Sequence, residues 1–447
     1  MEKQLIIDRL QEENARLKAR LRYQQRTAKE GPFGSSTPSA KIPIKPNAAP
    51  QNSQRRGGAK PGHRGYGRRS IPNDEITREQ RVAGPDQCPY CGAPLDPKDS
   101  KARTVIDVDP VRKEVIRYEL EQRDCARCHH TFTARPAGVF AKSLLGNRLL
   151  AYVAVEHYLH GITLGHLSTQ LALGQGTLWA ALHQLARRFE KVPERLLLEY
   201  RSSAVKHADE TGWRNDGLNG YAWLFCSARV SLFRFRHSRA GSVAQEVFGA
   251  KHLPGVLVVD RYKGYNQTPC AIQYCYSHLL REVQDLAKEF PQVAEVLGFV
   301  ATLAPLLADA IKLRAQGLKE PAFRQRALEL KLEIKSSIYA PAQHPGIQRI
   351  QNIFRENASR LYHWSKSPTI PAENNRAERE LRGLVIARKI SFGSQSEQGA
   401  RTREILMSVL HTLRKRTEDV FGAFNRCLDA LAEEEKRDPY QLLFDSS

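Results

Sequence analysis

The spacing of apolar residues divides the chain into parts with different periods. Residues 3–22 carry a short heptad pattern, and Asn14 occupies a core position that sets register and oligomer state in parallel coiled coils. A dimeric coiled coil is predicted here; an amphipathic helix packed on its own chain is the alternative, because three heptads are marginally stable. Residues 141–200 follow a helical period of about 3.6, and after Arg201 the period changes to 2.

The part with a period of 2 predicts a mixed sheet. Strands are expected at 204–209, 221–227, 230–235, 255–260 and 271–276, with a helix at 240–250. Asn219-Gly220 and Ala228-Arg229 fall in the predicted turns, and 255–260 is a continuous apolar run typical of a buried central strand. A three-stranded meander, a crossover helix and further strands follow the order of an RNase H-like α/β fold. Residues from about 279 to 365 are helical in pattern and are predicted to form an insertion.

Two C-x-x-C pairs precede the helical region. Their thiolates can converge on one structural, tetrahedral Zn²⁺, as in a zinc ribbon, and they belong to Cys88, Cys91, Cys125 and Cys128. Redox pairs or unligated cysteines are the alternative. The other cysteines, Cys226, Cys270, Cys275 and Cys427, lack this pairing and are interpreted as buried small residues. Cys275 and His278 form a C-x-x-H pair, but two donors are a weak metal signal, so a role in the core or in active-site hydrogen bonding is favoured.

Composition favours a polyanionic partner. The chain has 69 Lys and Arg against 48 Asp and Glu, which gives a formal charge of +21. The longest apolar stretch, Val296 to Ile311, contains Asp309 and Pro305 and is shorter than the roughly 20 residues of a membrane span. The first residues show no signal-peptide pattern, so a cytoplasmic protein with reduced thiols and no membrane contact is expected.

Three groups of residues are candidates for contacts with DNA. A linker rich in Pro, Gly, Ser and Gln carries cations suited to phosphates or a minor groove, namely Arg55, Arg56, Lys60, Arg64, Arg68 and Arg69. Residues 163–171 and 177–189 have helix-turn-helix proportions, and Gln175 and Thr177 lie where base edges would be read. Cations between 376 and 415 are expected to follow phosphates, and they include Arg379, Arg382, Arg388, Arg403 and Lys415. The respective alternatives are a solvated linker, a structural helical hairpin and surface ion pairs.

Three acidic residues stand in distinctive settings. Asp209 and Asp260 lie 51 positions apart at or near the ends of apolar runs, and Glu378 opens a helical pattern 118 positions later. Carboxylates on separate elements suit two Mg²⁺ ions, about 3.5 to 4 Å apart, that activate the attacking oxygen and stabilise the leaving oxygen at phosphorus. Each acid alone is also explained as a turn former or, for Glu378, as part of a capping box with Asn375. Glu210 adjoins Asp209, but successive strand residues point to opposite faces, so only one of them is expected to face the metals.

Several longer motifs occur in order along the chain. They include H-A-D-E-T-G-W-R, Q-Y-C-Y-S-H-L-L-R-E and P-A-E-N-N-R-A-E-R-E-L-R-G-L-V-I-A-R-K-I-S-F-G-S. Together they resemble the IS66 family of insertion-sequence transposases, and the match runs from the linker to about Arg414. The resemblance implies a DDE transposase that cleaves DNA at transposon ends with Mg²⁺, or with Mn²⁺, and joins the 3′-hydroxyl to target DNA. It assigns the triad to Asp209, Asp260 and Glu378, and Zn²⁺ to the four paired cysteines.

The third acid has an alternative. Family members usually have D-N-N where this chain has Glu373-Asn374-Asn375, which leaves a second acid five residues before Glu378. The two glutamates would lie about 140° apart on a helix, so both cannot face one metal pair. Glu378 is favoured, with Asn374 one turn before it on the same face.

The resemblance also implies partners. These are double-stranded DNA as transposon ends and target, a second copy of the chain in a homodimer or higher synaptic oligomer, and accessory proteins of the same element. The predicted organisation is a coiled coil (1–25), a basic linker (26–80), a zinc-binding domain (81–140), a helix-turn-helix-like region (141–200), a catalytic domain (201–415) and a helical tail (416–447). A domesticated DNA-binding protein without activity, and an RNase H-like nuclease without strand transfer, are the alternative functions.

Overall fold

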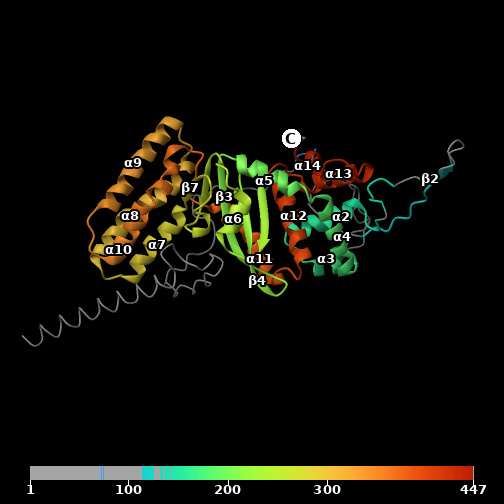
Figure 1. Cartoon of the computed structure of the whole chain (residues 1–447), viewed down its shortest axis with the longest axis horizontal. Coiled ribbons are helices and arrows are strands. Elements are labelled where there is room, and N and C mark those ends of the chain that lie inside the picture. Colours follow the sequence, from blue (N-terminus) through green and yellow to red (C-terminus); the bar gives the residue numbers. More distant parts are fainter. Residues whose placement is uncertain are drawn as a thin grey trace, which may run out of the picture. The chain divides into compact units, whose positions relative to one another are not determined.

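The computed structural model describes most of the chain after residue 112. The described residues are 72, 74, 113–124, 131–133, 136–141 and 143–445. The predicted coiled coil, the six candidate cations of the linker and the four paired cysteines lie outside these residues. Within the described part, residues from Val115 onward belong to one compact unit. The fold below is the fold of that unit (Figure 1).

A five-stranded mixed sheet forms the centre of the fold, as the period-2 pattern predicts. Its strands are β3 (Val205–Asn215), β4 (Leu218–Cys226), β5 (Ser231–Arg236), β6 (Val256–Val259) and β7 (Ala271–Tyr274). They are arranged in the order β5-β4-β3-β6-β7. The first three strands pair antiparallel, whereas β6 runs parallel to β3 and β7 runs parallel to β6. All four residues of β6 are buried, as expected for a central strand.

The β3–β4 hairpin differs from the sequence prediction at its turn. The turn consists of Asp216 and Gly217, whose φ angles of 49° and 73° are positive, as a two-residue hairpin turn requires. Asn219 and Gly220, which were predicted to form this turn, lie within β4 instead. A Cβ at Gly220 would lie 2.9 Å from the carbonyl oxygen of Arg236, so this glycine permits the close approach of the neighbouring strand.

Helix α12 (Glu397–Arg414) covers the outer edge of β5. Alternate N–H groups of β5 donate to side chains one turn apart on α12: Ser231 to Thr412 Oγ1 (3.0 Å), Phe233 to Ser408 Oγ (2.9 Å) and Phe235 to Glu404 Oε2 (3.2 Å). The spacings match because two strand residues span about 6.6 Å and four helical residues about 6.0 Å. The edge of the sheet is therefore satisfied within the chain and is not presented to another strand.

Helices precede the sheet in the chain. They are α2 (Asn147–Tyr158), α3 (Leu164–Leu171), α4 (Gln175–Arg188) and α5 (Val192–Ser202), after a short antiparallel pair of β1 (Gln122–Asp124) and β2 (Thr131–Thr133). The helix pair predicted at 163–189 is confirmed, although α4 begins two residues early. The break between α3 and α4 contains Ala172 in the left-handed conformation. The C-terminal helices α13 (Val420–Glu433) and α14 (Pro439–Phe444) pack against α2 and α5, respectively.

A helical insertion separates β7 from the last helices of the core. It contains α7 (Tyr276–Glu289), α8 (Ala294–Leu313), α9 (Glu320–Tyr339) and α10 (Pro345–Glu356), drawn in yellow and orange in Figure 1. The chain then enters α11 (Asn375–Ser391), which packs on β3 and β4.

One helical stretch of the described part could cross a membrane by length and composition alone. It covers Ala294–Gln316, with a mean hydropathy of 1.8, and is longer than the apolar run seen in the sequence. The helix within it, α8, packs against α7, α9 and α10, and Val296, Leu303 and Leu307 on one face are buried. Packing in the bundle therefore accounts for the apolar side chains of this face, whereas Leu297 is 43% exposed.

Candidate active site

Adjacent parallel strands bring Asp209 and Asp260 together. The register pairs His207 of β3 with Val258 of β6, so continuing two residues along both strands sets Asp209 opposite Asp260. Residues at the same level of neighbouring parallel strands point to the same face, and the strands lie about 4.8 Å apart. The separation of 51 positions therefore equals the register offset between the strands. Both side chains are half-buried at the C-terminal end of β6.

Asn374 fixes the helix that carries the third acid. This buried residue precedes α11, and its side-chain Nδ2 donates to the carbonyl oxygen of Ala208 at 2.8 Å. Nδ1 of His207 lies 2.9 Å from Oδ1 of Asn374. Burial lowers the pKa of His207 to about 3, so the ring is neutral and its Nδ1–H tautomer is the one that can donate to Asn374. These bonds hold the start of α11 beside Asp209, with Glu378 in the first helical turn.

Neighbouring carboxylates affect the pKa of Asp209. Burial raises the pKa of Asp209 well above its ordinary value, and repulsion from Glu210, Asp260 and Glu378 raises it further. Oε1 of Glu378 is buried without a hydrogen-bond partner among the described residues. The cluster thus concentrates negative charge that a divalent cation would stabilise.

Glu210 points away from this cluster, as strand alternation predicts. Its Oε1 pairs with Nη2 of Arg239 at 2.6 Å, and its Oε2 accepts a hydrogen bond from the hydroxyl of Tyr265 at 2.5 Å. Burial and the nearby Asp260 raise the pKa of Glu210 to about 7, although Arg239 and Tyr265 act in the opposite direction. Glu210 therefore has its own partners on the other face of β3.

Glu378, and not Glu373, is among the neighbours that raise the pKa of Asp209. Glu373 lies two residues before α11 and is half-buried; burial raises its pKa and Glu378 adds to this, whereas Arg314 and Arg379 lower it. Glu378 contributes to the pKa shifts of both Asp209 and His278. Electrostatics therefore link Glu378 to Asp209, while a carboxylate oxygen of Glu378 lies within 4.8 Å of the donor atoms of Cys275 and His278.

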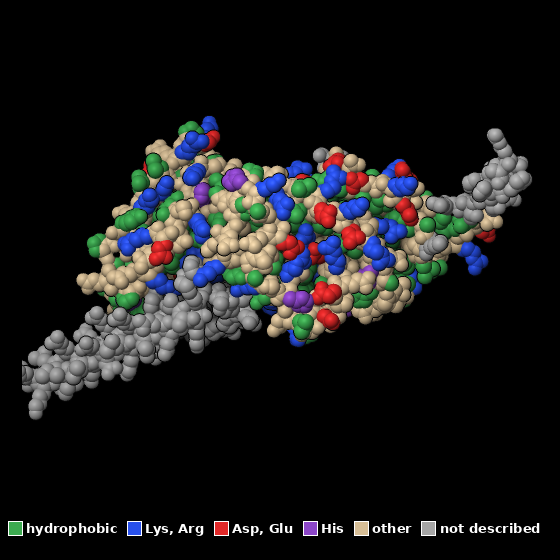
Figure 2. All heavy atoms as spheres, viewed as in Figure 1, with side chains coloured by type: hydrophobic (Ala, Val, Ile, Leu, Met, Phe, Trp, Pro, Cys, Tyr) green, Lys and Arg blue, Asp and Glu red, His purple; other side chains and the backbone are tan. Residues whose placement is uncertain are grey.

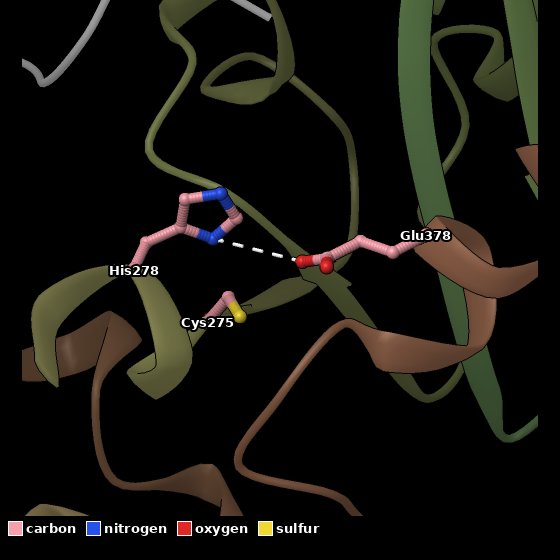
Figure 3. Close-up of side chains that lie close together, drawn as sticks. All are labelled: Cys275, His278 and Glu378. Carbon is pink, nitrogen blue, oxygen red and sulfur yellow. Dashed lines mark ion pairs between the residues drawn. The ribbon is translucent and has the colours of Figure 1, made fainter. Parts of the chain in front are cut away.

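Sequence reasoning gave little weight to two further residues at this site. Cys275 directly follows β7 and lies level with Asp260 in the sheet register, and His278 is in the first turn of α7. Their donor atoms and a carboxylate oxygen of Glu378 all lie within 4.8 Å of one another (Figure 3). Burial lowers the pKa of His278, but Cys275, Asp260 and Glu378 outweigh it and raise the pKa to about 9. The C-x-x-H spacing was the available signal, but its third member lies 100 residues downstream.

A comparison with protein families matches this part of the chain. The family model described as "Transposase IS66 family" covers residues 142–402, which is more than half of the chain. The chain belongs to the IS66 transposase family. The matched region contains Asp209, Asp260 and Glu378 together with the elements that position them.

Two relatives of this IS66-family chain come from Sinorhizobium fredii. The uncharacterized protein y4qI is 24% identical over an alignment of 343 residues, and the match covers 67% of this chain and 62% of that protein. The uncharacterized protein y4jD is 22% identical over an alignment of 380 residues, and the match covers 73% of this chain and 71% of that protein. The chain thus spans less than two thirds of the first relative, and neither name states an activity.

The DNA-contact candidates of this IS66-family chain occupy different environments. Gln175 and Thr177 are exposed in the first turn of α4, and Arg379 and Arg382 are exposed on α11. Nη1 of Arg388 donates to the carbonyl oxygen of Gly212 at 2.7 Å, so this side chain holds α11 on β3. Two of the predicted phosphate contacts are wrong because their side chains are used inside the fold. These are Arg403, which is buried against Tyr158 and Trp213, and Lys415, which pairs with Glu380.

Proposed function

We propose that this IS66-family chain is a DDE transposase with an RNase H-like core. It binds transposon ends, cleaves DNA with Mg²⁺ and joins the end to target DNA. The observation that carries the proposal is the parallel register of β3 and β6, which leads to Asp209 and Asp260 at the same level, with Glu378 on the helix anchored to β3. The strand order, an antiparallel meander followed by two parallel strands, supports the RNase H-like assignment.

The three carboxylates fit a site for Mg²⁺. The raised pKa of Asp209, caused by burial and then by neighbouring acids, indicates repulsion that bound cations would relieve, and Glu378 has a buried oxygen without a hydrogen bond. Asp209, Asp260 and Glu378 would hold the ions, with Mn²⁺ as a substitute for Mg²⁺. When bound, Mg²⁺ activates the attacking oxygen and stabilises the leaving oxygen at phosphorus.

The protein's own part in the reaction is to position these acids. Asn374 ties the start of α11 to β3, and Arg388 ties its last turns to the same strand. The position of Glu378 relative to the sheet is therefore fixed, and the strand register fixes the positions of the two aspartates. Such rigid support is what a phosphoryl-transfer site requires, because positioning and electrostatic stabilisation supply most of the catalysis.

The outer face of α11 provides a path for DNA beside the acids. Cations and apolar side chains share one helical face within about 120°, at Arg379, Arg382, Ile386, Lys389 and Ile390, and all five are exposed. Lys and Arg side chains occur across the visible face of the described part, with Asp and Glu among them, so net charge alone does not locate a path there (Figure 2). The α11 face is distinguished because its cations begin one residue after Glu378.

An exposed aromatic side chain follows this face. Phe392 is 73% exposed and has a positive φ of 58° at the end of α11. The next residues are fastened to the β3–β4 hairpin, because Ser394 N donates to Arg214 O at 2.9 Å and Trp213 Nε1 donates to Ser394 Oγ at 3.1 Å. The ring is therefore presented on a rigid support, as a platform for stacking on a DNA base would need.

Replacing Arg382 with alanine is expected to weaken binding to end DNA across all sequences. The salt dependence of log K should become shallower by about one unit, because one phosphate contact is lost. Fluorescence anisotropy at several salt concentrations measures both quantities. Arg324→Ala, which removes an exposed arginine of α9 that pairs with Glu320, is the matched control and should keep the wild-type slope. An unchanged slope for Arg382→Ala would exclude a phosphate contact there.

Other parts of the proposal concern residues outside the described part. They are structural zinc at the C-x-x-C pairs, phosphate contacts by the linker cations and a coiled coil at the N-terminus. A homodimer or higher synaptic oligomer follows from the need to hold two DNA ends together. Accessory proteins of the same element remain the implied partners.

The direct test uses the full chain with oligonucleotides that bear the ends of its own element, in Mg²⁺ or Mn²⁺. We expect strand cleavage at the ends, followed by joining of labelled ends to a target plasmid, and loss of both in EDTA. Cleavage without joining would identify an RNase H-like nuclease instead. Binding without cleavage, with any accessory proteins of the element added, would identify an inactive DNA-binding descendant.

A further inference from the structure

We propose that Cys275, His278 and Glu378 form a second cation site, which binds a thiophilic divalent ion such as Zn²⁺. The three donor atoms, a thiol sulfur, an imidazole nitrogen and a carboxylate oxygen, lie within 4.8 Å of one another. They come from two places in the fold, because Cys275 and His278 begin α7, whereas Glu378 lies in the first turn of α11. Figure 3 shows the imidazole and the carboxylate facing each other, with the thiol beside them.

Two donor atoms of this cluster are buried and have no hydrogen-bond partner among the described residues. They are Nδ1 of His278 and Oε1 of Glu378, which lie 4.0 Å apart. A direct hydrogen bond between them would need about 3 Å. A zinc ion bonded to nitrogen and oxygen at about 2.0 to 2.1 Å in tetrahedral geometry separates these donors by roughly 3.4 Å. A shift of well under 1 Å would therefore give both atoms a partner.

The donor set selects a different class of ion from the three carboxylates. Sulfur and imidazole ligands favour Zn²⁺ and similar transition metals, whereas Mg²⁺ prefers oxygen ligands alone. Three protein donors leave one coordination position of a tetrahedral ion open for water or another oxygen. The N-terminal dipole of α7 opposes a cation at this place, whereas the Glu378 carboxylate, 4.0 Å from Nδ1 of His278, favours one.

The surroundings of the thiol also suit a metal-bound thiolate. Cys275 is fully buried at the end of β7, and the backbone N–H of Asn374 donates to its sulfur at 3.2 Å. This hydrogen bond holds the sulfur in place beside the other two donor atoms. Asn374 is the residue that fastens α11 to β3, so one residue supports both the thiol and the helix of Glu378.

An ion at this site would affect the reaction, given the proposed function. Glu378 would be shared between the two aspartates and the Cys275–His278 pair. A thiophilic ion at this pair would hold the Glu378 carboxylate on the side of α7 and reduce its availability to the aspartates. We therefore expect Zn²⁺ to inhibit Mg²⁺-dependent cleavage, and to do so less in a variant that lacks the thiol.

The test measures metal binding without DNA, so its result is independent of transposition. Full-length wild type, Cys275→Ser and Cys427→Ser are equilibrated with Zn²⁺, dialysed and analysed for bound metal, and Co²⁺ is titrated while thiolate-to-cobalt absorption is followed. Cys427, a buried cysteine of α13, provides the matched control. Any ion held by the C-x-x-C cysteines contributes equally to all three proteins. We expect Cys275→Ser to bind one ion fewer per chain, and Cys427→Ser to match the wild type.

Equal stoichiometry and equal absorption in folded wild type and Cys275→Ser would overturn the proposal. His278→Gln is the second variant, because it keeps the thiol and removes one donor. It should weaken the affinity for the additional ion at least about tenfold, while the circular dichroism spectrum stays unchanged. Wild-type affinity in His278→Gln would contradict the site even if Cys275→Ser failed to fold. A chain that binds the additional ion but never cleaves DNA would refute the proposed function and leave this site standing.

Discussion

Changing Asp209 to asparagine is expected to reduce cleavage of end DNA by at least about a thousandfold. The substitution keeps the size of the side chain but removes the charge of one of two level carboxylates, which are proposed to hold Mg²⁺. Cleavage of labelled oligonucleotides under single-turnover conditions measures the rate. Binding of the same DNA in a mobility-shift assay should stay close to that of the wild type, because positioning of the duplex is assigned to cations on α11.

The same substitution is not expected to destabilise the metal-free protein. Burial, followed by Glu210, Asp260 and Glu378, raises the pKa of Asp209 above its ordinary value, so the folded protein disfavours the charged form. The stability contributed by its protonated form is therefore present at low pH and is lost as the pH rises through the ordinary pKa of an aspartate toward the raised one. Asp209→Asn should remove this dependence, and thermal unfolding in EDTA at several pH values measures it.

A matched control distinguishes loss of a carboxylate at the site from loss of a carboxylate elsewhere in the chain. Asp285→Asn makes the same chemical change on α7, at an acid that pairs with Lys288 on the surface. It should cleave DNA at nearly the wild-type rate. Substantial cleavage by folded Asp209→Asn would remove this residue from the proposed site, and a lowered unfolding temperature for that variant would contradict the repulsion described above.

A large loss of cleavage is expected for only one of the two candidate glutamates, Glu378 and Glu373. Glu378→Gln is expected to abolish cleavage, again by at least about a thousandfold, because its carboxylate joins the aspartate cluster. Glu373→Gln should stay within about threefold of the wild type, because Glu373 lies before α11 among arginines. Both variants exchange a carboxylate for an amide of the same shape, so each serves as the control for the other. An active Glu378→Gln beside an inactive Glu373→Gln would reverse the assignment.

The limits of the sequence predictions follow from how far apart the contacting residues lie. The hairpin turn was placed at Asn219-Gly220 because this pair favours such turns, whereas Asp216-Gly217 forms it and Gly220 meets the backbone of Arg236. Charge alone predicts phosphate contacts for Arg403 and Lys415, but tertiary contacts bury or pair them. In each case a contact between distant segments decided the role of a residue whose local signal pointed elsewhere.

Local patterns by themselves determined the strands, the helix pair at 163–189 and the candidates Asp209 and Asp260, because side-chain periods and strand ends follow from backbone geometry over a few residues. The motifs also indicated the family that the comparison later showed. Only the tertiary structure decided the rest: the register that sets Asp209 level with Asp260, the anchoring of Glu378 beside them and the meeting of Glu378 with Cys275 and His278. These contacts join residues from 51 to more than 100 positions apart, and their geometry depends on packing of the whole unit, which no local pattern encodes.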